Sequence, residues 1–531
     1  MSGHERLVIC LSLTGKTIAE NLRAISRYAF CIDLVELRAD FLLPTERPEV
    51  DRFPSAVPAG RDGYRLPAIL TVRAPRDGGK WNEGEGERRH LLSHGLQGGG
   101  YAYVDLETWI AGEDESLRTA AAADGTAVIR SLHDFEGIPE GLAGFLGGDG
   151  VAAGEIPKAA VTPNGSADLV RFVEAVTAAR AAGDSHPRIV VAMGSVGFPA
   201  RVLAGRFGSL LTFCSPISHD EVSAAPGHID PATMHDLYRY PEITEHTAVF
   251  GVVGNPVMHS RSPAYHNERF ASDGLDAVYL PFEVDDPAAF VRLGELLPIQ
   301  GFSVTIPHKQ AVIPFLREVD ESVSDAGACN TVVRDGLGWV GFNSDVTGFL
   351  EPLRDAVAAA GTVAGATPAG ATPTGAAGLR GMRATVVGAG GAARAVVSAL
   401  LREGVAVLLL NRTVERAERL RDEIATRLPA AAAVRVAPLD ESSASLIAES
   451  GDIIVQTTSI GMEPDIDGDA IDFYRFSGSE IVYDIVYTPE ETALLRRAAA
   501  AGCRTVSGRL MFERQADAQY QRYRQVVLLA R

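Results

Sequence analysis

Cysteine is scarce in this chain of 531 residues, which contains only Cys10, Cys31, Cys214, Cys329 and Cys503. The five are scattered and form no Cys-x-x-Cys pair. This spacing argues against a thiolate zinc site and fits a reducing compartment. We therefore expect a cytoplasmic protein without a metal site.

Long apolar runs and an excess of basic residues are also missing. No segment approaches the roughly 18 apolar residues that a membrane-spanning helix needs. Residues 7–13 are apolar but few, and no small-residue cleavage pattern follows them, so we interpret them as a first strand rather than a signal peptide. The net charge of −19 argues against nonspecific binding to nucleic acid or to anionic membranes.

What the chain does have is length and enough apolar material for several cores. Its 531 residues predict three or four domains of about 150 residues each, and 46% of the residues are hydrophobic. In the first half, helical patterns such as 17–25, 88–97 and 167–182 alternate with eight apolar runs: 7–13, 31–38, 68–72, 101–106, 127–132, 156–161, 189–193 and 210–213. This alternation predicts a (β/α)8 barrel over residues 1–235, with its chemistry at the carboxyl ends of the strands.

Two side chains in this half suggest a reaction. Lys158 lies inside an otherwise apolar strand, and burial favours a neutral amine that can attack a carbonyl and form a Schiff base. His133 is a natural proton-transfer partner, because imidazole titrates near neutrality. For either residue alone, a surface lysine or a satisfied core histidine would be the simpler interpretation.

Six segments of this half together resemble type I 3-dehydroquinate dehydratase, in order over about residues 5–235: 33–40, 71–73, 103–107, 131–135, Lys158, and 193–203. The resemblance implies that Lys158 forms an imine with the C3 ketone of 3-dehydroquinate. It implies that His133 removes the C2 proton and then helps the C1 hydroxyl to leave. It also implies that the substrate is held by Glu36, Arg38, Arg73 and Arg201, since the arginine fork suits a carboxylate.

Two places depart from the family pattern. Asp77 stands where the family has a glutamate, so its carboxylate is one methylene shorter. The loop after the eighth strand has Ala224 and His228 in place of the family's serine or threonine and glutamine, with Ser223 one position early. We expect a first site that is active but weakened or retuned.

A glycine-rich turn organises the second half. Residues 383–394 read Arg-Ala-Thr-Val-Val-Gly-Ala-Gly-Gly-Ala-Ala-Arg, which predicts a buried strand, a tight turn and a helix. Such a turn lets backbone N–H groups and a helix N-terminus approach a pyrophosphate. The next predicted strand ends at Asn411, and Arg412 then offers a cation where an acidic residue would grip a ribose 2′-hydroxyl. This favours NADP over NAD.

Further polar residues precede and follow that turn. Ser260 and Ser262 lie in a turn after an apolar run, and their hydroxyls suit a carboxylate, although capping is the more common role. Lys309 and Asp345 stand in separate motifs and suit an acid–base couple at a ketone, although most such pairs are surface salt bridges.

Together these motifs resemble shikimate dehydrogenase over about residues 247–531, through segments 301–309, 326–332, 341–348, 456–462, 483–489 and 508–515. The resemblance implies that Lys309 and Asp345 are catalytic. It implies that substrate is bound by Ser260, Ser262, Thr305, Asn330, Tyr487 and Gln515. It also implies that NADP is bound by Gly388, Gly390, Gly391, Ala392, Asn411, Arg412 and Thr413.

These patterns define a domain plan for the second half. We predict a substrate-binding domain at 247–350 that is completed by 508–531, and a Rossmann NADP-binding domain at 380–507. Residues 357–378 are rich in Ala, Gly, Thr and Pro and carry no charge, which predicts a loop-forming linker.

The two resemblances describe consecutive reactions, so we expect a bifunctional enzyme that converts 3-dehydroquinate to 3-dehydroshikimate and then to shikimate. One alternative is a quinate or shikimate dehydrogenase with a weakened or silent barrel. Another is a quinate-sensing regulator, against which the four catalytic residues and the lack of a basic DNA-reading segment both argue. Oligomeric state is left open, with a homodimer as one alternative.

Overall fold

The computed structural model describes residues 7–182, 186–216, 229–363 and 378–529. The chain divides into two compact units, residues 1–299 and 300–531. Within the described ranges, no helix is long and apolar enough to cross a membrane. The predicted departures at Ser223, Ala224 and His228 lie outside the described residues.

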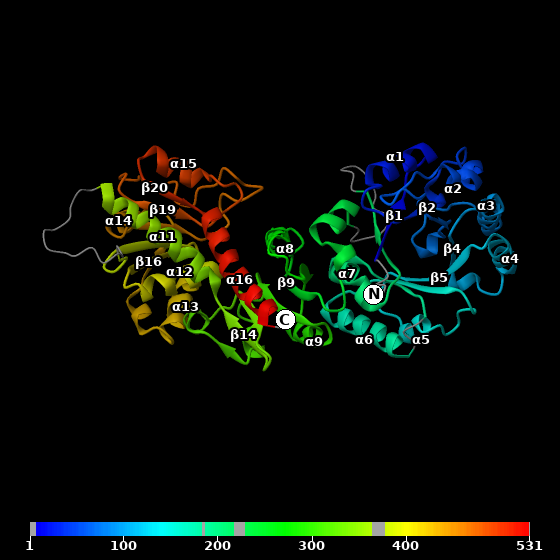
Figure 1. Ribbon diagram of the computed structural model, residues 1–531. Coiled ribbons are helices and arrows are strands. Elements are labelled where there is room, and N and C mark those ends of the chain that lie inside the picture. Colours follow the sequence, from blue (N-terminus) through cyan, green and yellow to red (C-terminus); the bar gives the residue numbers. More distant parts are fainter. Residues whose placement is uncertain (1–6, 183–185, 217–228, 364–377, 530–531) are drawn as a thin grey trace. The chain divides into compact units, whose positions relative to one another are not determined.

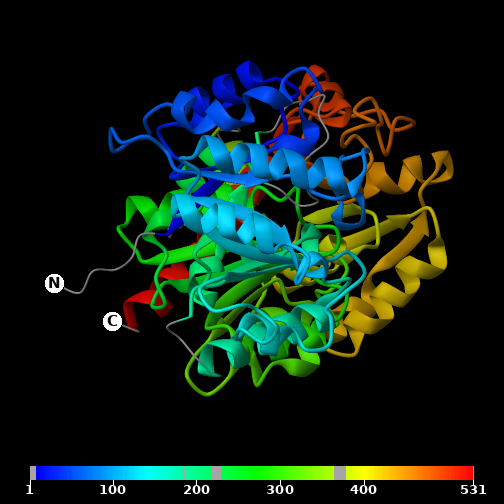
Figure 2. The ribbon, with the colours of Figure 1, turned by 90° about the vertical axis from the view of Figure 1, so that its right-hand side faces the viewer.

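Unit 1 begins with the predicted barrel, and all eight strands are confirmed (Figures 1 and 2). Their hydrogen-bonded order is β7-β6-β5-β4-β3-β2-β1-β8, and every neighbouring pair is parallel. Between β7 and β8 the described residues form an isolated parallel bridge, Arg188 to Ser209, so the barrel is nearly closed. The strands are β1 (Val8–Leu13), β2 (Leu34–Arg38), β3 (Ala68–Thr71), β4 (Tyr103–Glu107), β5 (Ala127–Asp134), β6 (Ile156–Val161), β7 (Ile189–Ala192) and β8 (Leu211–Cys214).

Helices follow most of the strands, as the alternating pattern predicted. They are α1 (Ile18–Tyr28), α2 (Phe53–Ala56), α3 (Glu85–Gly98), α4 (Glu115–Asp124), α5 (Leu142–Leu146), α6 (Ser166–Ala182) and α7 (Gly194–Val202). The last barrel helix is short, with α-helical residues 231–232 followed by a π-helix at Thr233–Leu237. Arg239 has a left-handed backbone (φ 50°), and Pro241 disfavours helical geometry just before it, so the helix cannot continue.

The remainder of unit 1 is a β-α-β-α segment that follows the barrel. It contains β9 (Ala248–Gly254), α8 (Ser262–Ser272), β10 (Ala277–Glu283) and α9 (Pro287–Leu296). Strands β9 and β10 are parallel, with Ala277 opposite Ala248 and Glu283 opposite Gly254. The turn with Ser260 and Ser262 lies at the carboxyl end of β9.

Unit 2 opens with strands in the order β11-β13-β14-β12, of which β11–β13 and β13–β14 are antiparallel. Their bounds are β11 (Ile299–Val304), β12 (Glu318–Val319), β13 (Thr331–Arg334) and β14 (Trp339–Phe342). Helix α10 (Glu321–Ala326) lies between β12 and β13, and α11 (Ser344–Val363) follows β14. Among the candidate residues here, Thr305 and Lys309 follow β11, Asn330 directly precedes β13, and Asp345 lies in the first turn of α11.

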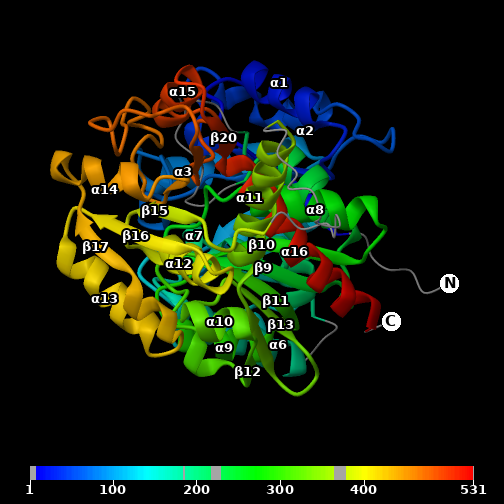
Figure 3. The same ribbon diagram turned by 90° about the vertical axis from the view of Figure 1, so that its left-hand side faces the viewer.

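The second sheet of unit 2 is all parallel, with the order β17-β16-β15-β18-β19-β20 (Figure 3). This is the doubly wound order of a Rossmann sheet, and its switch point lies between β15 and β18. The strands are β15 (Arg383–Val387), β16 (Ala406–Asn411), β17 (Arg435–Pro438), β18 (Ile453–Gln456), β19 (Ile481–Asp484) and β20 (Arg504–Ser507). The helices are α12 (Gly391–Arg402), α13 (Val414–Ala425), α14 (Ala444–Glu449), α15 (Ala493–Ala500) and α16 (Gly508–Leu529).

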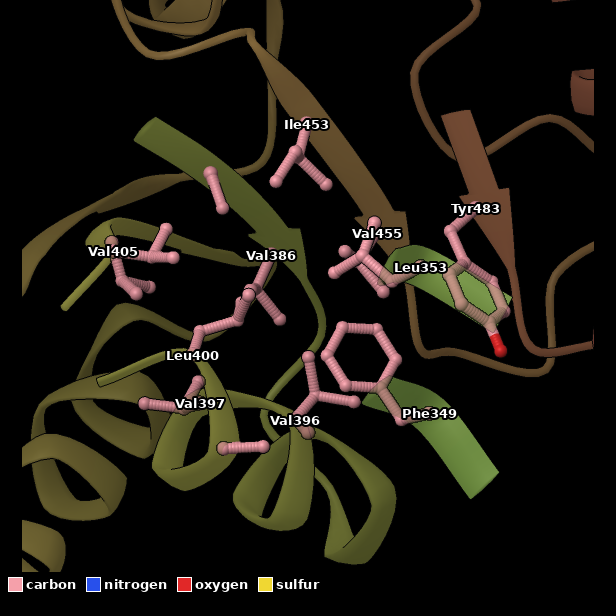
Figure 4. Close-up of a cluster of buried hydrophobic side chains, with 14 of the residues drawn as sticks. Phe349, Leu353, Val386, Val396, Val397, Leu400, Val405, Ile453, Val455 and Tyr483 are labelled. Atoms are coloured by element: carbon pink, nitrogen blue, oxygen red, sulfur yellow. The ribbon is translucent and has the colours of Figure 1, made fainter. Parts of the chain in front are cut away.

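A buried apolar cluster joins α11 to the Rossmann sheet (Figure 4). Phe349 and Leu353 of α11 lie against Val386, Val455 and Tyr483 of three sheet strands, and both are fully buried. The sheet strands in this cluster are short apolar runs in the sequence, because parallel strands that are buried on both faces are rich in β-branched and other apolar residues. The packing holds the start of α11, which carries Asp345, at a set place beside the cofactor sheet.

The linker prediction needs a correction at its start. Helix α11 continues to Val363 and therefore includes the first residues of the stretch 357–378 that we expected to be a loop. The alanines at 358–360 have the highest helix propensity, which extends the helix. Residues 364–377 lie outside the described part of the chain.

Candidate active sites

The first candidate site is assembled at the carboxyl ends of the barrel strands. Lys158 stands on β6 and is buried, with 6% of its side chain exposed. Its Nζ lies 2.8 Å from Asp105 Oδ2, 3.9 Å from Glu36 Oε1 and 4.4 Å from the centre of the Phe213 ring. The lysine is therefore a buried, ion-paired group in the barrel core, and the interpretation as a surface lysine is wrong.

Asp105 connects this lysine to Arg73. Arg73 Nη2 lies 2.8 Å from Asp105 Oδ2, while its Nη1 donates to Ser131 Oγ at 2.8 Å. Ser131 in turn donates to Asp105 Oδ1 at 2.5 Å. Burial by itself would raise the pKa of Asp105, but the charges of Arg73 and Lys158 outweigh it and hold that pKa well below its usual range. The carboxylate thus stays ionised beside the amine.

His133 lies on β5 and faces Asp77. Its Nδ1 is 3.6 Å from Asp77 Oδ1, which is longer than a normal hydrogen bond, and Trp109 Nε1 donates to the other oxygen of Asp77 at 2.8 Å. Burial, followed by the charge of Arg73, lowers the pKa of His133 to about 4. The imidazole is consequently neutral at physiological pH and free to accept a proton.

The other predicted substrate-holding residues also line up with strand ends. Glu36 accepts hydrogen bonds from Ser12 and from Thr71 Oγ1, so its carboxylate is held in place. Arg38 forms a two-pronged pair with Asp40, with both contacts at 2.9 Å. Arg201 comes from α7 and is buried, and this burial lowers its pKa to about 10.

The second candidate site centres on Lys309 and Asp345 in unit 2. Lys309 Nζ lies 2.5 Å from Asp345 Oδ2, with 20% and 10% of the two side chains exposed. Asn330 donates to Asp345 Oδ1 at 2.7 Å, and its own Oδ1 accepts from the backbone N–H of Ser344 at 2.8 Å. The pair is thus partly buried and oriented by a third residue, which a surface salt bridge is not.

Helix α16 completes this site from the end of the chain. Gln515 Oε1 lies 3.4 Å from both Asn330 Nδ2 and Ser344 Oγ. One turn further on, Gln519 bonds the carbonyl of Asn330 at 3.2 Å and accepts from Ser303 Oγ at 2.9 Å. As predicted, the last helix returns to the residues around the Lys309 pair.

The remaining predicted substrate contacts are spread over both units. Thr305 directly follows β11, four residues before Lys309. Tyr487 is 41% exposed and stacks on Phe512 of α16. Ser260 Oγ accepts from the backbone N–H of Ser262 at 3.2 Å in unit 1, so their roles as ligands stay predictions.

The glycine turn has the geometry that a dinucleotide requires. Gly388 has φ +106°, and a Cβ there would lie 2.8 Å from Thr457 Oγ1, so only glycine fits. A Cβ at Gly390 or Gly391 would meet nothing within 4 Å, which leaves open space above the N-terminus of α12. Ala392 follows in the first turn of that helix. The residues present therefore fit a pyrophosphate.

Two cavities flank this turn. One of about 680 Å³ is lined by residues that include Gly388, Asn411, Arg412 and Arg416. Asn411 Nδ2 donates to the carbonyl of Thr413 at 2.7 Å, which shapes the turn before α13. The other cavity, of about 460 Å³, is lined by Lys309 together with Gly390, Gly391 and Arg416. Lys309 and the glycine turn thus line the same cavity.

Sequence reasoning missed several of these residues. Asp105 and Ser131 were quoted only as parts of motifs, although an acidic residue inside a buried strand is itself a signal. Arg416 lies four residues after Arg412, and Gln519 lies four after Gln515. On α16 that spacing places Gln515 and Gln519 near one another, whereas Arg412 precedes α13 and Arg416 lies within it.

Comparison with known families agrees with this geometry. Residues 9–245 match the model of type I 3-dehydroquinase, residues 252–332 match the shikimate dehydrogenase substrate binding domain, and residues 373–463 match shikimate/quinate 5-dehydrogenase. These matches define the class: a dehydroquinase barrel followed by a dehydrogenase of the shikimate type.

Individual relatives cover the chain further. A bifunctional 3-dehydroquinate dehydratase/shikimate dehydrogenase of Arabidopsis thaliana is 32% identical over 499 residues, which span 92% of this chain and 77% of the relative. An NADP(+) shikimate dehydrogenase of Shouchella clausii is 37% identical over 51% of this chain and 90% of its own length. A crystal structure of a shikimate dehydrogenase with NADP+ aligns with 52% of this chain and 90% of that chain, at 32% identity and a TM-score of 0.45. The chain belongs to the family of bifunctional 3-dehydroquinate dehydratases/shikimate dehydrogenases.

Proposed function

We propose that this chain dehydrates 3-dehydroquinate to 3-dehydroshikimate in the barrel and reduces that product to shikimate with NADPH in unit 2. The observation that carries the proposal is the pairing of one lysine with a carboxylate in each unit. Lys158 meets Asp105 at 2.8 Å, and Lys309 meets Asp345 at 2.5 Å.

In the barrel, the Lys158 amine attacks the C3 carbonyl, and loss of water forms an imine. Asp105 and Glu36 stabilise the positive charge of this imine, because their carboxylates lie beside Nζ. Neutral His133 accepts the C2 proton, and the electrons of that bond form an enamine. His133 returns the proton to the C1 hydroxyl, which leaves as water. Hydrolysis of the remaining imine then frees the product and the amine.

Arginine side chains suit the carboxylate of this substrate. Arg201 is buried within the barrel, and Arg73 is held by Asp105 and Ser131. We infer that these cations orient the ring over Lys158, since a guanidinium can bind both oxygens of a carboxylate. We also infer that the 3.6 Å separation between His133 and Asp77 leaves the site active but weaker than one with a glutamate at 77.

In the second site, NADPH supplies a hydride to the ketone carbon when it is bound. Lys309 gives a proton to the ketone oxygen, and Asp345 holds the lysine against that oxygen. Asn330 fixes the Asp345 carboxylate, and Gln515 adds an amide beside it. The glycine turn would hold the pyrophosphate, and the cations Arg412 and Arg416 would hold the 2′-phosphate.

A coupled assay tests both steps at once. Purified chain supplied with 3-dehydroquinate and NADPH should consume NADPH, and Lys158→Ala should abolish this while leaving oxidation of shikimate with NADP intact. Borohydride with 3-dehydroquinate should add mass to Lys158 in the wild type. No adduct and no NADPH consumption would contradict the dehydratase.

Cofactor and substrate choice are tested separately. Arg412→Ser should raise KM for NADP by about 10- to 100-fold with little effect on NAD, because it removes one charged phosphate contact. Turnover of shikimate with NADP should exceed turnover of quinate with NAD. The reverse preference would favour the quinate dehydrogenase alternative.

All five cysteines are free and buried, which supports a reducing, cytoplasmic location.

A further inference from the structure

Arg88 of helix α3 is a fully buried cation to which neither resemblance assigns a role. Its guanidinium makes a two-pronged pair with Glu85 of the same helix, at 2.7 and 2.9 Å. Its Nη1 also donates to Glu107 Oε2 at 2.8 Å and to the carbonyl of Val72 at 2.7 Å. Arg88 is therefore not an ordinary solvated charge on a helix surface, because it is buried and contacts two neighbouring barrel strands or their ends.

The first set of contacts leads to Arg73. Val72 directly precedes it, so the bond to the Val72 carbonyl fixes the backbone from which Arg73 projects. Glu107 Oε1 accepts from the N–H of Ala74 at 3.2 Å and lies 3.5 Å from Arg73 Nη1. Arg88 therefore holds the peptide group that precedes Arg73. It also holds the carboxylate of Glu107, which contacts the Arg73 guanidinium as Asp105 does.

The second set of contacts leads to His133. The Arg88 guanidinium lies 5.3 Å from the centre of the Trp109 ring, a cation–π distance. Trp109 donates to Asp77 at 2.8 Å, and Asp77 faces His133 at 3.6 Å. Arg76 also lies over this ring, at 4.9 Å, but it is exposed, so Arg88 is the buried guanidinium that supports the base through Trp109 and Asp77.

We propose that Arg88 is a positioning residue of the dehydratase. It holds Arg73 in place directly, and it holds His133 in place through Trp109 and Asp77. Its charge balances Glu107, so that Glu107 does not draw Arg73 away from Asp105. Only a planar fork reaches Glu85, Glu107 and the Val72 carbonyl together, and a lysine cannot. The proposal rests on the dehydratase activity proposed above.

The experiment compares four variants of the full chain. Arg88→Lys keeps the charge and loses the fork, whereas Arg88→Met loses both. Arg88→Met combined with Glu107→Gln removes the charge at both ends of the pair. Arg89→Lys is the matched control, because Arg89 also pairs with Glu85 but is 30% exposed and makes no bond to Glu107 or Val72 among the described contacts.

Arg88→Lys and Arg88→Met should lower kcat for dehydration by about 10- to 100-fold and raise KM, since a small displacement of catalytic groups costs that much. In Arg88→Met, the acidic limb of the kcat/KM profile should also move to higher pH, because an unbalanced Glu107 adds negative charge near His133 and competes for Arg73. Adding Glu107→Gln should restore kcat/KM and the profile in large part, since a buried pair tolerates loss of both charges better than loss of one.

Oxidation of shikimate by the same chain and its thermal unfolding report whether each variant is folded. If Arg88→Lys and Arg88→Met both show a normal kcat, KM and pH profile for dehydration, the proposal is overturned. A loss in Arg88→Met that Glu107→Gln does not repair, or an equal loss in Arg89→Lys, would also overturn it. If Arg88→Met fails to fold, Arg88→Lys decides by the same kinetic measurements. A wild-type chain without dehydration would instead overturn the proposed function itself.

Discussion

At the scale of single residues, the two lysines are placed in different surroundings. Lys158 is 6% exposed and lies between two carboxylates and an aromatic ring, whereas Lys309 is 20% exposed and has one carboxylate partner. A Schiff-base lysine needs a dry site with negative charge nearby, because its intermediate is positive. A lysine that donates a proton needs access to a substrate that enters from solvent.

The pKa of His133 leads to a prediction about pH. Burial and Arg73 lower this pKa to about 4, below the ordinary value of about 6.5. The imidazole should therefore be neutral at pH 5–7 and gain its proton only as the pH falls through about 4. An NMR titration of the histidines, with His133→Gln to assign the signal, checks this. A titration midpoint near 6.5 would show that the surroundings of His133 do not lower its pKa.

Asp77 offers a gain-of-function prediction. Its carboxylate stands 3.6 Å from His133, so Asp77→Glu should bring the oxygen within hydrogen-bond distance and orient the base better. We expect kcat for dehydration to rise by up to about tenfold, measured by formation of the conjugated product. Asp77→Asn is the control that loses the charge, and it should lower kcat. A lower kcat in both variants would show that the aspartate side chain already has the best length for orienting His133.

At the scale of elements, the site in unit 2 is built where strands end and a long helix returns. There, α11 carries Asp345 at its start and buries Phe349 and Leu353 against the Rossmann sheet, so one helix ties the Lys309–Asp345 pair to that sheet. Helix α16 packs on α11 and carries Gln515. Rigid helices position such groups more accurately than loops do.

The crossing of α11 and α16 depends on Gly348. A Cβ at this position would lie 2.6 Å from the Gln515 Cβ and 2.8 Å from the Met511 carbonyl, which forces the helices apart. Gly348→Ala should destabilise unit 2 by about 1–3 kcal/mol and raise KM for shikimate, as measured by denaturant unfolding and kinetics. Dehydration should not change. Gly86→Ala on α3, where a Cβ meets nothing within 4 Å, should instead stabilise by up to ~1 kcal/mol.

At the scale of the whole molecule, Lys158 and Lys309 lie in different compact units, 1–299 and 300–531. No residue of the Lys158 cluster belongs to unit 2, within the described contacts. The chain thus combines two independent chemistries that act on the same ring in succession.

This separation predicts complementation between two inactive variants. Lys158→Ala should keep shikimate oxidation, and Lys309→Ala should keep dehydration but lose NADPH turnover by at least about 100-fold. Mixing the two proteins with 3-dehydroquinate and NADPH should restore shikimate formation, followed by absorbance at the NADPH band. Failure of the mixture, with each single activity intact, would show that dehydroshikimate must pass within one chain.

Much of the fold was predictable from local patterns. Eight apolar runs marked the eight barrel strands, because a strand buried on both faces must be apolar along its length. The run before Gly388 and the helical spacing after Gly391 marked the first Rossmann unit for the same reason. The place where the last barrel helix ends was not predictable, because Arg239 takes a left-handed backbone that no periodicity shows.

The candidate sites divide in the same way. Lys158, His133, Lys309 and Asp345 stand out in the sequence, since a charged or titratable residue within an apolar strand or a motif is costly and needs a reason. Their partners do not stand out. Arg88 and Gln519 resemble ordinary polar residues until packing brings them into contact with Glu107 and Asn330, which in turn contact Arg73 and Asp345.

The sequence by itself determined the order of domains, the two reactive lysines and the nucleotide turn, because each depends on neighbours a few positions away. The tertiary structure alone decided which carboxylate faces which amine, and that Arg88 reaches Glu107 across 19 positions of the chain. Such pairings depend on how strands and helices pack, and a charge in a sequence does not reveal whether it will be buried or left in water.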